Sequence, residues 1–186
     1  RVDRRQRQMC IRDSINAIDY IKGAPLHVAC LSDGNRELVM ALVYMGADIH
    51  ARDHDERTPL HVACIKGNME VAMVLMYSGA IIRAGDDLGK TPLHWACIKG
   101  NMELAMVLVD RGADIHVGDD GEITPLHEAC YGGNMELVMA LLNMGANIHA
   151  RDEFQRTPLH EACINGHMEF CLLYTSPSPR DATLSR

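Results

Sequence analysis

The sequence predicts an all-α solenoid in which helix–turn–helix units stack in a row and are joined by hairpin-like finger loops. The first observation is a repeat: the tripeptide Pro-Leu-His occurs five times, with its prolines at 25, 59, 92, 125 and 158. The intervals between these prolines are 34, 33, 33 and 33 residues. The second observation is that each interval holds two short helical patterns. A unit of about 33 residues cannot bury its own apolar face, so neighbouring units must share one core.

The first helix of each unit is predicted to start at a Thr-Pro pair. In the second unit the hydroxyl of Thr58 can cap the helix, and Pro59 occupies the first helical position, where no amide donor is needed. Gly67 tolerates the left-handed conformation that often follows a helix. In the first unit Ala24 replaces the threonine, which costs about 1 kcal/mol of capping free energy.

The second helix of each unit follows an asparagine that can cap it. In the second unit Asn68 precedes an apolar face over residues 69–77, and Gly79 ends the helix. Residues 80–86 then form an extended turn, the finger, before the next helix pair.

Alignment of the five copies on their prolines brings an acidic residue, six positions earlier, into register. These residues are Asp19, Asp53, Asp86, Asp119 and Asp152. The pattern resembles the ankyrin repeat, whose signature is a TPLHxA string at a period of 33. The resemblance implies units at 19–52, 53–85, 86–118 and 119–151 and a truncated fifth unit at 152–170, within one domain over residues 15–170.

The repeat pattern stops on both sides of this domain. Residues 9–14 and 171–175 can be encoded by the two halves of one inverted DNA repeat, and they resemble a translated transposon-end adapter of the kind used for sequencing libraries. We therefore expect residues 1–14 and 171–186 to be adapter-derived and disordered, and residues 15–170 to be a piece of a longer array. The alternative is a basic N-terminal arm and a Ser/Pro-rich tail.

The charge of the array disfavours nucleic acid and anionic membranes as partners. Residues 15–170 contain 11 Lys and Arg against 22 Asp and Glu, a formal charge of −11 compared with −7 for the whole chain. No apolar run reaches the roughly 20 residues that a membrane-spanning helix needs. We expect an intracellular protein that is monomeric as a full-length chain.

The cysteines and histidines recur once per unit, which favours structural roles. Equivalent positions on stacked helices lie about 8–10 Å apart, beyond disulfide reach, so the cysteines are predicted to be buried in the core; the alternative, a zinc site, lacks a CxxC or HxxxH pair. The repeat histidine, by resemblance, hydrogen-bonds backbone around the TPLH turn. The finger histidines His50, His116 and His149 are predicted to be turn residues. No catalytic motif occurs, so we expect no enzyme activity, cofactor or metal.

The resemblance implies that a protein partner binds the concave face, which the fingers and the first helices line. We therefore predict a partner-binding surface made of the following residues: His54, Asp55, Arg57, Ile65, Lys66, Asp87, Leu88, Lys90, Trp95, Ile98, Lys99, Asp120, Ile123, Tyr131, Glu153, Phe154, Arg156 and Ile164.

Two features of this surface allow alternatives. One column is apolar in every unit, and it is either the centre of an interface or part of the core: Leu31, Ile65, Ile98, Tyr131 and Ile164. Glu128 and Glu161 replace the apolar residues of earlier units, which predicts a concave face that becomes more acidic along the array. The array is interpreted as a protein-interaction module. The alternative is a substrate-recruiting segment of a larger enzyme or of a ubiquitin-ligase adaptor.

Overall fold

The computed structural model describes residues 14–19, 23–32 and 36–170 and contains nine helices in that part of the chain, with no strand there. The helices that follow the Thr-Pro or Ala-Pro pairs are α2 (Pro25–Leu31), α4 (Pro59–Lys66), α6 (Pro92–Ile98), α8 (Pro125–Tyr131) and α10 (Pro158–Ile164). The second helices of the units are α3 (Arg36–Tyr44), α5 (Met69–Tyr77), α7 (Met102–Asp110) and α9 (Met135–Asn143). The all-α solenoid is confirmed. The expectations for residues 1–14 and 171–186 concern, apart from Ser14, positions outside the described residues.

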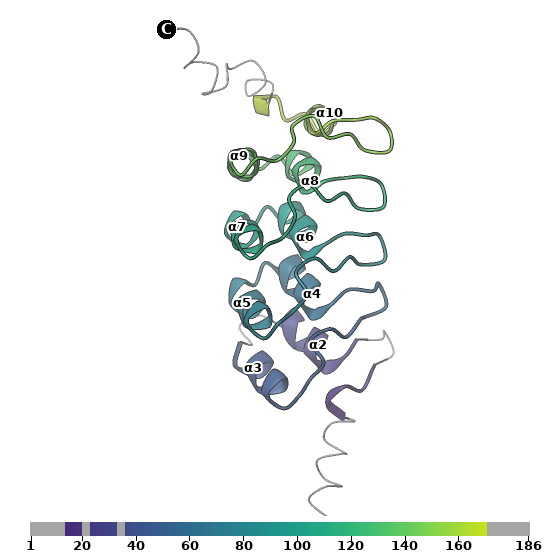
Figure 1. Ribbon diagram of the computed structural model, residues 1–186, viewed down its shortest axis with the longest axis vertical. Helices are drawn as coiled ribbons and strands as arrows, with labels where there is room; N and C mark the ends of the chain where they lie inside the picture. The colour runs from purple at the N-terminus through teal and green to yellow at the C-terminus, as the bar shows by residue number, and fades with distance from the viewer. Residues whose placement is uncertain (1–13, 20–22, 33–35, 171–186) are drawn as a thin grey trace, which may run out of the picture.

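The two sets of helices form two parallel columns. Figure 1 shows α2, α4, α6, α8 and α10 stacked in one column, which we call the inner helices, and α3, α5, α7 and α9 in the other, which we call the outer helices. The finger loops project from the side of the inner helices. From α2 to α8, every inner helix packs against its outer partner and against the inner helix of the next unit, and α10 packs against α8. The molecule therefore has a finger side and an outer side.

A histidine at the third position fixes the start of each inner helix. In α4 the backbone amide of Thr58 donates to Nδ1 of His61 at 3.0 Å, and the threonine hydroxyl lies 2.8 Å from the same nitrogen. The ring thus takes the place that Glu or Gln holds in a capping box. In α2, where Ala24 replaces the threonine, only the amide contact to His27 remains, at 3.2 Å.

The same histidine joins its unit to the next one. Its Nε2 donates to a backbone carbonyl at the base of the following finger, in the pairs His27–Arg57 (2.9 Å), His61–Lys90 (3.1 Å), His94–Ile123 (2.9 Å) and His127–Arg156 (3.2 Å). Because Nδ1 accepts an amide hydrogen and Nε2 faces a carbonyl, the geometry assigns a neutral ring with its proton on Nε2. The resemblance predicted hydrogen bonds around the TPLH turn, and the contact with the next unit is a further finding.

A second ladder runs through the asparagines that cap the outer helices. Asn101 accepts the amide of Leu104 with Oδ1 at 3.1 Å, and its Nδ2 donates to the carbonyl of Gly67 in the preceding unit, also at 3.1 Å. Asn134 repeats the arrangement on Gly100, at 2.9 Å. Gly67 has a φ of 70° and lies so close to Asn101 that a Cβ would be only 3.2 Å from the amide nitrogen. Glycine therefore serves both the helix end and the contact between units.

In the structure each finger runs from the end of an outer helix to the start of the next inner helix, and the repeat aspartate closes its tip. Oδ1 of Asp53 accepts the backbone amides of Asp55 and Arg57, at 3.0 and 2.9 Å. Neighbouring fingers are also connected through their backbones, for example by the amide of Asp87 and the carbonyl of Asp55 at 3.1 Å. The tips need one residue in the left-handed region, at Glu56, Gly89, Glu122 and Gln155. The fingers thus form a continuous, hydrogen-bonded edge.

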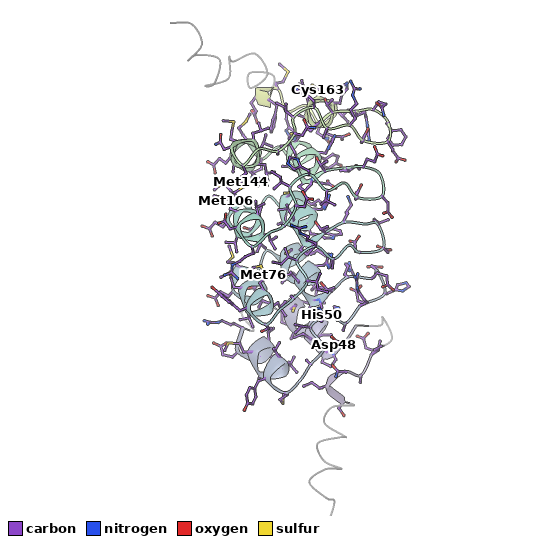
Figure 2. The ribbon with its side chains drawn as sticks, viewed as in Figure 1. Asp48, His50, Met76, Met106, Met144 and Cys163 are labelled. Carbon is purple, nitrogen blue, oxygen red and sulfur yellow. The ribbon has the colours of Figure 1, made fainter. Side chains whose placement is uncertain are left out.

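Leucines and cysteines fill the core between the columns. Cys30, Cys64, Cys97 and Cys130 are buried, as the sequence predicted, and burial raises the pKa of each thiol, to about 12 for Cys30 and Cys130. Cys163 differs because it lies at the α10 end of the stack and is exposed (Figure 2).

We expect stability to fall in mild acid because two of the bridging histidines must stay neutral. Burial lowers the pKa of His61 and of His94 to about 4 from an ordinary value of 6.5. Below pH 6.5 the unfolded chain binds these protons first, so stability that is complete above pH 6.5 is lost as the pH falls towards 4. Between pH 7 and pH 5 the loss should be about 2 kcal/mol for each histidine, measured by urea unfolding.

The variant His94→Gln should be less stable at pH 7 and should show a shallower decline towards pH 5. His116→Gln, which changes an exposed finger histidine, is the matched control and should keep the decline of the parent chain. Equal declines in the parent chain and in His94→Gln would contradict a neutral, bridging His94.

Thiol labelling should separate the cysteines of the array by their burial. With iodoacetamide at pH 8, Cys64 and Cys97 should react about a hundredfold more slowly than Cys163, because burial raises their pKa and excludes the reagent. Mass spectrometry of the digested chain gives the rate for each site. Comparable rates at the three sites would show that the inner helices do not stay packed.

Candidate functional site

The finger side contains a hollow at its N-terminal end, between α2, α4 and the second-unit finger. It has a volume of about 290 Å³. Its floor is apolar and comes from two inner helices: Val28, Leu31, Val62 and Ile65. Its rim comes from the finger, through Asp53, His54, Asp55 and Arg57. Four of the predicted partner-binding residues, His54, Asp55, Arg57 and Ile65, therefore lie around one space.

The predicted apolar column lines the same side of the array. Leu31, Tyr131 and Ile164 have 43%, 56% and 62% of their surface exposed, while Ile65 and Ile98 are half-buried. Burial in the core is thus excluded for the three exposed members, and none of the five is fully covered. An interface role for the column stays a prediction. All five side chains have exposed surface that a partner could contact.

Val28 and Val62 are part of the hollow but were not among the predicted residues. Both lie three residues before a member of the apolar column, on the same face of an inner helix. The i, i+3 spacing from Leu31 and Ile65 was the signal that could have identified them.

The rim of the hollow holds two carboxylates around one guanidinium. Nε of Arg57 lies 2.9 Å from Oδ2 of Asp53, and a terminal nitrogen of the same guanidinium lies 2.6 Å from Oδ2 of Asp55. Asp53 is buried, whereas the side chain of Asp55 is 43% exposed. The rim thus presents one accessible carboxylate beside an apolar floor.

The middle of the array uses its charges differently. Position 123 is isoleucine where the other complete fingers have Arg57, Lys90 and Arg156, so the fourth finger lacks its own cation for Asp119. Lys90 of the preceding unit supplies it: Nζ lies 2.7 Å from Asp119 and also pairs with Glu128. Burial alone would lower the pKa of Lys90, but the hydrogen bonds and charges of these two carboxylates outweigh it and raise the pKa.

Trp95 makes this arrangement possible. Its indole N–H donates to Oδ2 of Asp86 at 2.8 Å, so the carboxylate of the third finger has a partner other than Lys90. Lys90 is then available for the fourth unit. Trp95 is half-buried and held against its own finger, with part of the ring left on the finger side.

The two glutamates that were expected to make the finger side more acidic along the array also take part in ion pairs. The side chain of Glu128 is only 12% exposed and pairs with Lys90, which it shares with Asp119. Glu161, also 12% exposed, lies 3.3 Å from Arg156, which in turn pairs with Asp152 and covers the ring of Phe154. Each of the two cations is shared by two carboxylates, so an excess of negative charge remains at these pairs. The increase in acidity along the array stays a prediction.

The other predicted residues form a row along the fingers and helix ends instead of a single cluster. Most are exposed, and Ile123 is half-buried: Lys66, Asp87, Leu88, Lys99, Asp120, Ile123, Glu153 and Phe154. The finger histidines are exposed as well, and the amide of His50 closes a turn on Asp48 at 2.8 Å (Figure 2). This confirms the predicted turn role of His50.

Within residues 14–19, 23–32 and 36–170, no helix is long and apolar enough to cross a membrane. No group of three or more His, Cys, Asp and Glu side chains in this part of the chain is placed to hold a metal ion.

A row of paired fingers over apolar inner helices defines a repeat protein whose accessible surface is suited to contact with other proteins. Residues 26–119 match the family described as ankyrin repeats (3 copies), and residues 126–173 match ankyrin repeats (many copies). The chain belongs to the ankyrin repeat family.

Two curated relatives are similar over a short stretch. Protein phosphatase 1 regulatory subunit 27 from Mus musculus and its counterpart from Homo sapiens are each 57% identical over 44 residues. The match covers 24% of this chain and spans only 28% of the relatives' length. It is little longer than one repeat unit.

We expect Lys90→Met to destabilise the array because it leaves Asp119 and Glu128 without their cation. The loss should be about 2 kcal/mol by urea unfolding, below the roughly 3–5 kcal/mol of a fully buried pair because Nζ keeps some contact with solvent. Lys99→Met, at an exposed position, is the matched control and should change stability by less than about 0.5 kcal/mol. Adding Asp119→Asn and Glu128→Gln to Lys90→Met should recover part of the loss, and no recovery would contradict the pairing.

Proposed function

We propose that this chain is a non-catalytic protein-interaction module whose hollow on the finger side receives an apolar side chain of a partner protein. The observation that carries the proposal is the composition of the hollow. Its floor of Val28, Leu31, Val62 and Ile65 is apolar, and the charges of its rim are already paired. An apolar residue can enter such a space without stripping water from an unpaired charge.

The chemistry of the described side chains supports a role in binding over catalysis. Four repeat histidines have both ring nitrogens engaged by backbone, so they are not positioned as bases or nucleophiles. The buried cysteines have raised pKa values, which opposes formation of the reactive thiolate.

The charge around the hollow indicates the chemistry of the partner. Asp55 leaves much of its carboxylate in solvent, and the chain carries a formal charge of −7. A partner segment with a basic residue next to its apolar anchor would complement both features. The row of fingertips from Asp87 to Phe154 would extend the contact along the array, with Trp95 and Ile98 as apolar points between the hollow and the C-terminal units.

A second candidate is a regulatory segment that brings a substrate or an enzyme to a larger assembly. It rests on the 57% identity with protein phosphatase 1 regulatory subunit 27, whose name makes it a regulatory subunit of a phosphatase. Binding of the purified catalytic subunit of protein phosphatase 1 to this chain, measured by biolayer interferometry, would favour this candidate. If the subunit does not bind at micromolar concentration, this candidate is refuted, and the similarity reflects only the shared repeat sequence.

Peptide display tests the role of the hollow. Random peptides selected on the immobilised 186-residue chain should be enriched in segments that pair an aliphatic residue with Lys or Arg. Binding of a selected peptide should weaken about tenfold or more in Ile65→Glu, because the new carboxylate occupies the apolar floor. The matched control is Met139→Glu, at a position 39% exposed on the outer helix α9, and it should bind as the parent chain does. Equal affinities of the parent chain and Ile65→Glu would refute the hollow as the site.

A further inference from the structure

The outer side of the array carries a second hollow, opposite the fingers. It lies between α3 and α5 and has a volume of about 420 Å³. Its lining is mainly apolar and aromatic, with Met40, Val43 and Tyr44 from α3 and Val74 and Tyr77 from α5. Figure 1 shows these two helices at the N-terminal end of the outer column, and Figure 2 places Met106 further along the same column. This surface is separate from the proposed site on the finger side.

The two tyrosines occupy equivalent positions in neighbouring units but differ in their surroundings. The guanidinium of Arg111, which follows α7, lies over the ring of Tyr77 at 4.3 Å from its centroid. Tyr44 is 93% exposed, and no cation or ring from the described residues lies against it. The second unit thus forms a cation–π pair with the third unit through Tyr77, whereas Tyr44 of the first unit forms no such pair with the described residues of the second.

The repeat register explains the difference. Arg111 lies 34 positions after Tyr77. The residue 34 positions after Tyr44 is Ser78, so serine occupies the place of the arginine. The hydroxyl of Ser78 donates to the carbonyl of Val74 in its own helix at 2.8 Å, so it does not reach across to Tyr44. The ring of Tyr44 is therefore an open cation site, for which the described residues provide no cation.

The electrostatics at this end of the hollow also favour a cation. Tyr44 and Tyr77 are the last residues of α3 and α5, where helix carbonyls place partial negative charge. Arg36, the basic residue of the lining, belongs to the first turn of α3, two helical turns away from Tyr44. A bound chain would thus place its cation at the Tyr44 end and its apolar residues towards Met40 and Val43.

We propose that this outer hollow binds an arginine-containing apolar segment of a second protein, with the guanidinium stacked on Tyr44. The arginine of the partner takes the place that Arg111 holds on Tyr77. Its apolar neighbours fill the space over Met40, Val43 and Val74. The array then has two binding sides, and the outer one does not depend on the finger-side hollow.

The test uses the 186-residue chain with ¹³C-labelled methionine methyl groups, so that Met40 reports from inside the hollow. The probe is a short blocked peptide with a central Leu-Arg-Leu, and its twin carries citrulline, a neutral analogue, in place of arginine. We expect the arginine peptide to shift the Met40 methyl signal and to bind about fivefold more tightly than the citrulline peptide. Equal affinities of the two peptides would overturn the proposal.

Variants locate the contact. Tyr44→Leu keeps an apolar side chain but removes the aromatic face, and Ser78→Arg supplies the missing cation from the chain itself; each should remove the fivefold preference for arginine. The matched control Tyr131→Leu and the finger-side variant Ile65→Glu should keep it. Loss of the preference in either of these two variants would overturn the proposal. If Ile65→Glu does not weaken the binding of display-selected peptides, that result refutes only the finger-side site.

Sedimentation decides between a partner and a second copy of this chain. The parent chain should remain a monomer at the concentrations of the titration, with or without Ser78→Arg. A dimer that Ser78→Arg dissociates would assign the outer hollow to self-association and would also overturn the proposal.

Discussion

The stack of units depends on a neutral imidazole that makes two hydrogen bonds of opposite direction. In each complete unit the histidine accepts an amide hydrogen from the start of its own inner helix and donates to a carbonyl at the base of the next finger. A side chain with one acceptor and one donor on opposite sides of a flat ring can do both. A carboxylate could cap the helix but could not donate to the next unit, which is a physical reason for histidine at this position.

Units differ from one another in how the aspartate of each finger is paired. Units two and five pair their finger aspartates with their own arginines, Asp53 with Arg57 and Asp152 with Arg156. The third unit gives its aspartate an indole partner and passes its lysine to the fourth, whose finger has isoleucine in the basic position. One substitution, Ile123, is thus balanced by a lysine 33 positions earlier. The electrostatic pairing is a property of neighbouring units instead of single ones.

The two sides of the solenoid differ in how much of their surface is already in use. On the finger side the rim charges are paired and the apolar floor is open, which favours a partner that brings an apolar anchor. On the outer side the aromatic ring of Tyr44 is open because Ser78 stands where the next unit has Arg111. The outer site arises where one unit departs from its neighbour, against a backbone arrangement that is otherwise the same.

The sequence by itself determined the repeat, the starts and ends of the helices, and the burial of the unit cysteines from Cys30 to Cys130. These features follow from local rules: an asparagine cap, a proline in the first turn, a glycine at the end and a period of 33. The predicted threonine cap is wrong, because the hydroxyl makes no hydrogen bond to the helix backbone and contacts the ring of the repeat histidine instead. The sequence also predicted that the finger side holds His54, Asp55, Arg57 and Ile65, because they occupy periodic positions. The structure places these four residues around the hollow.

Only the tertiary structure decided which charges are paired. The two partners of Lys90 lie 29 and 38 residues further along the chain, and such distances in sequence carry no local signal. Val28 and Val62 became part of the hollow for the same reason: the space exists only where two units and a finger meet. The helices followed from local rules within a unit, whereas the hollow on the finger side depends on side chains from two units.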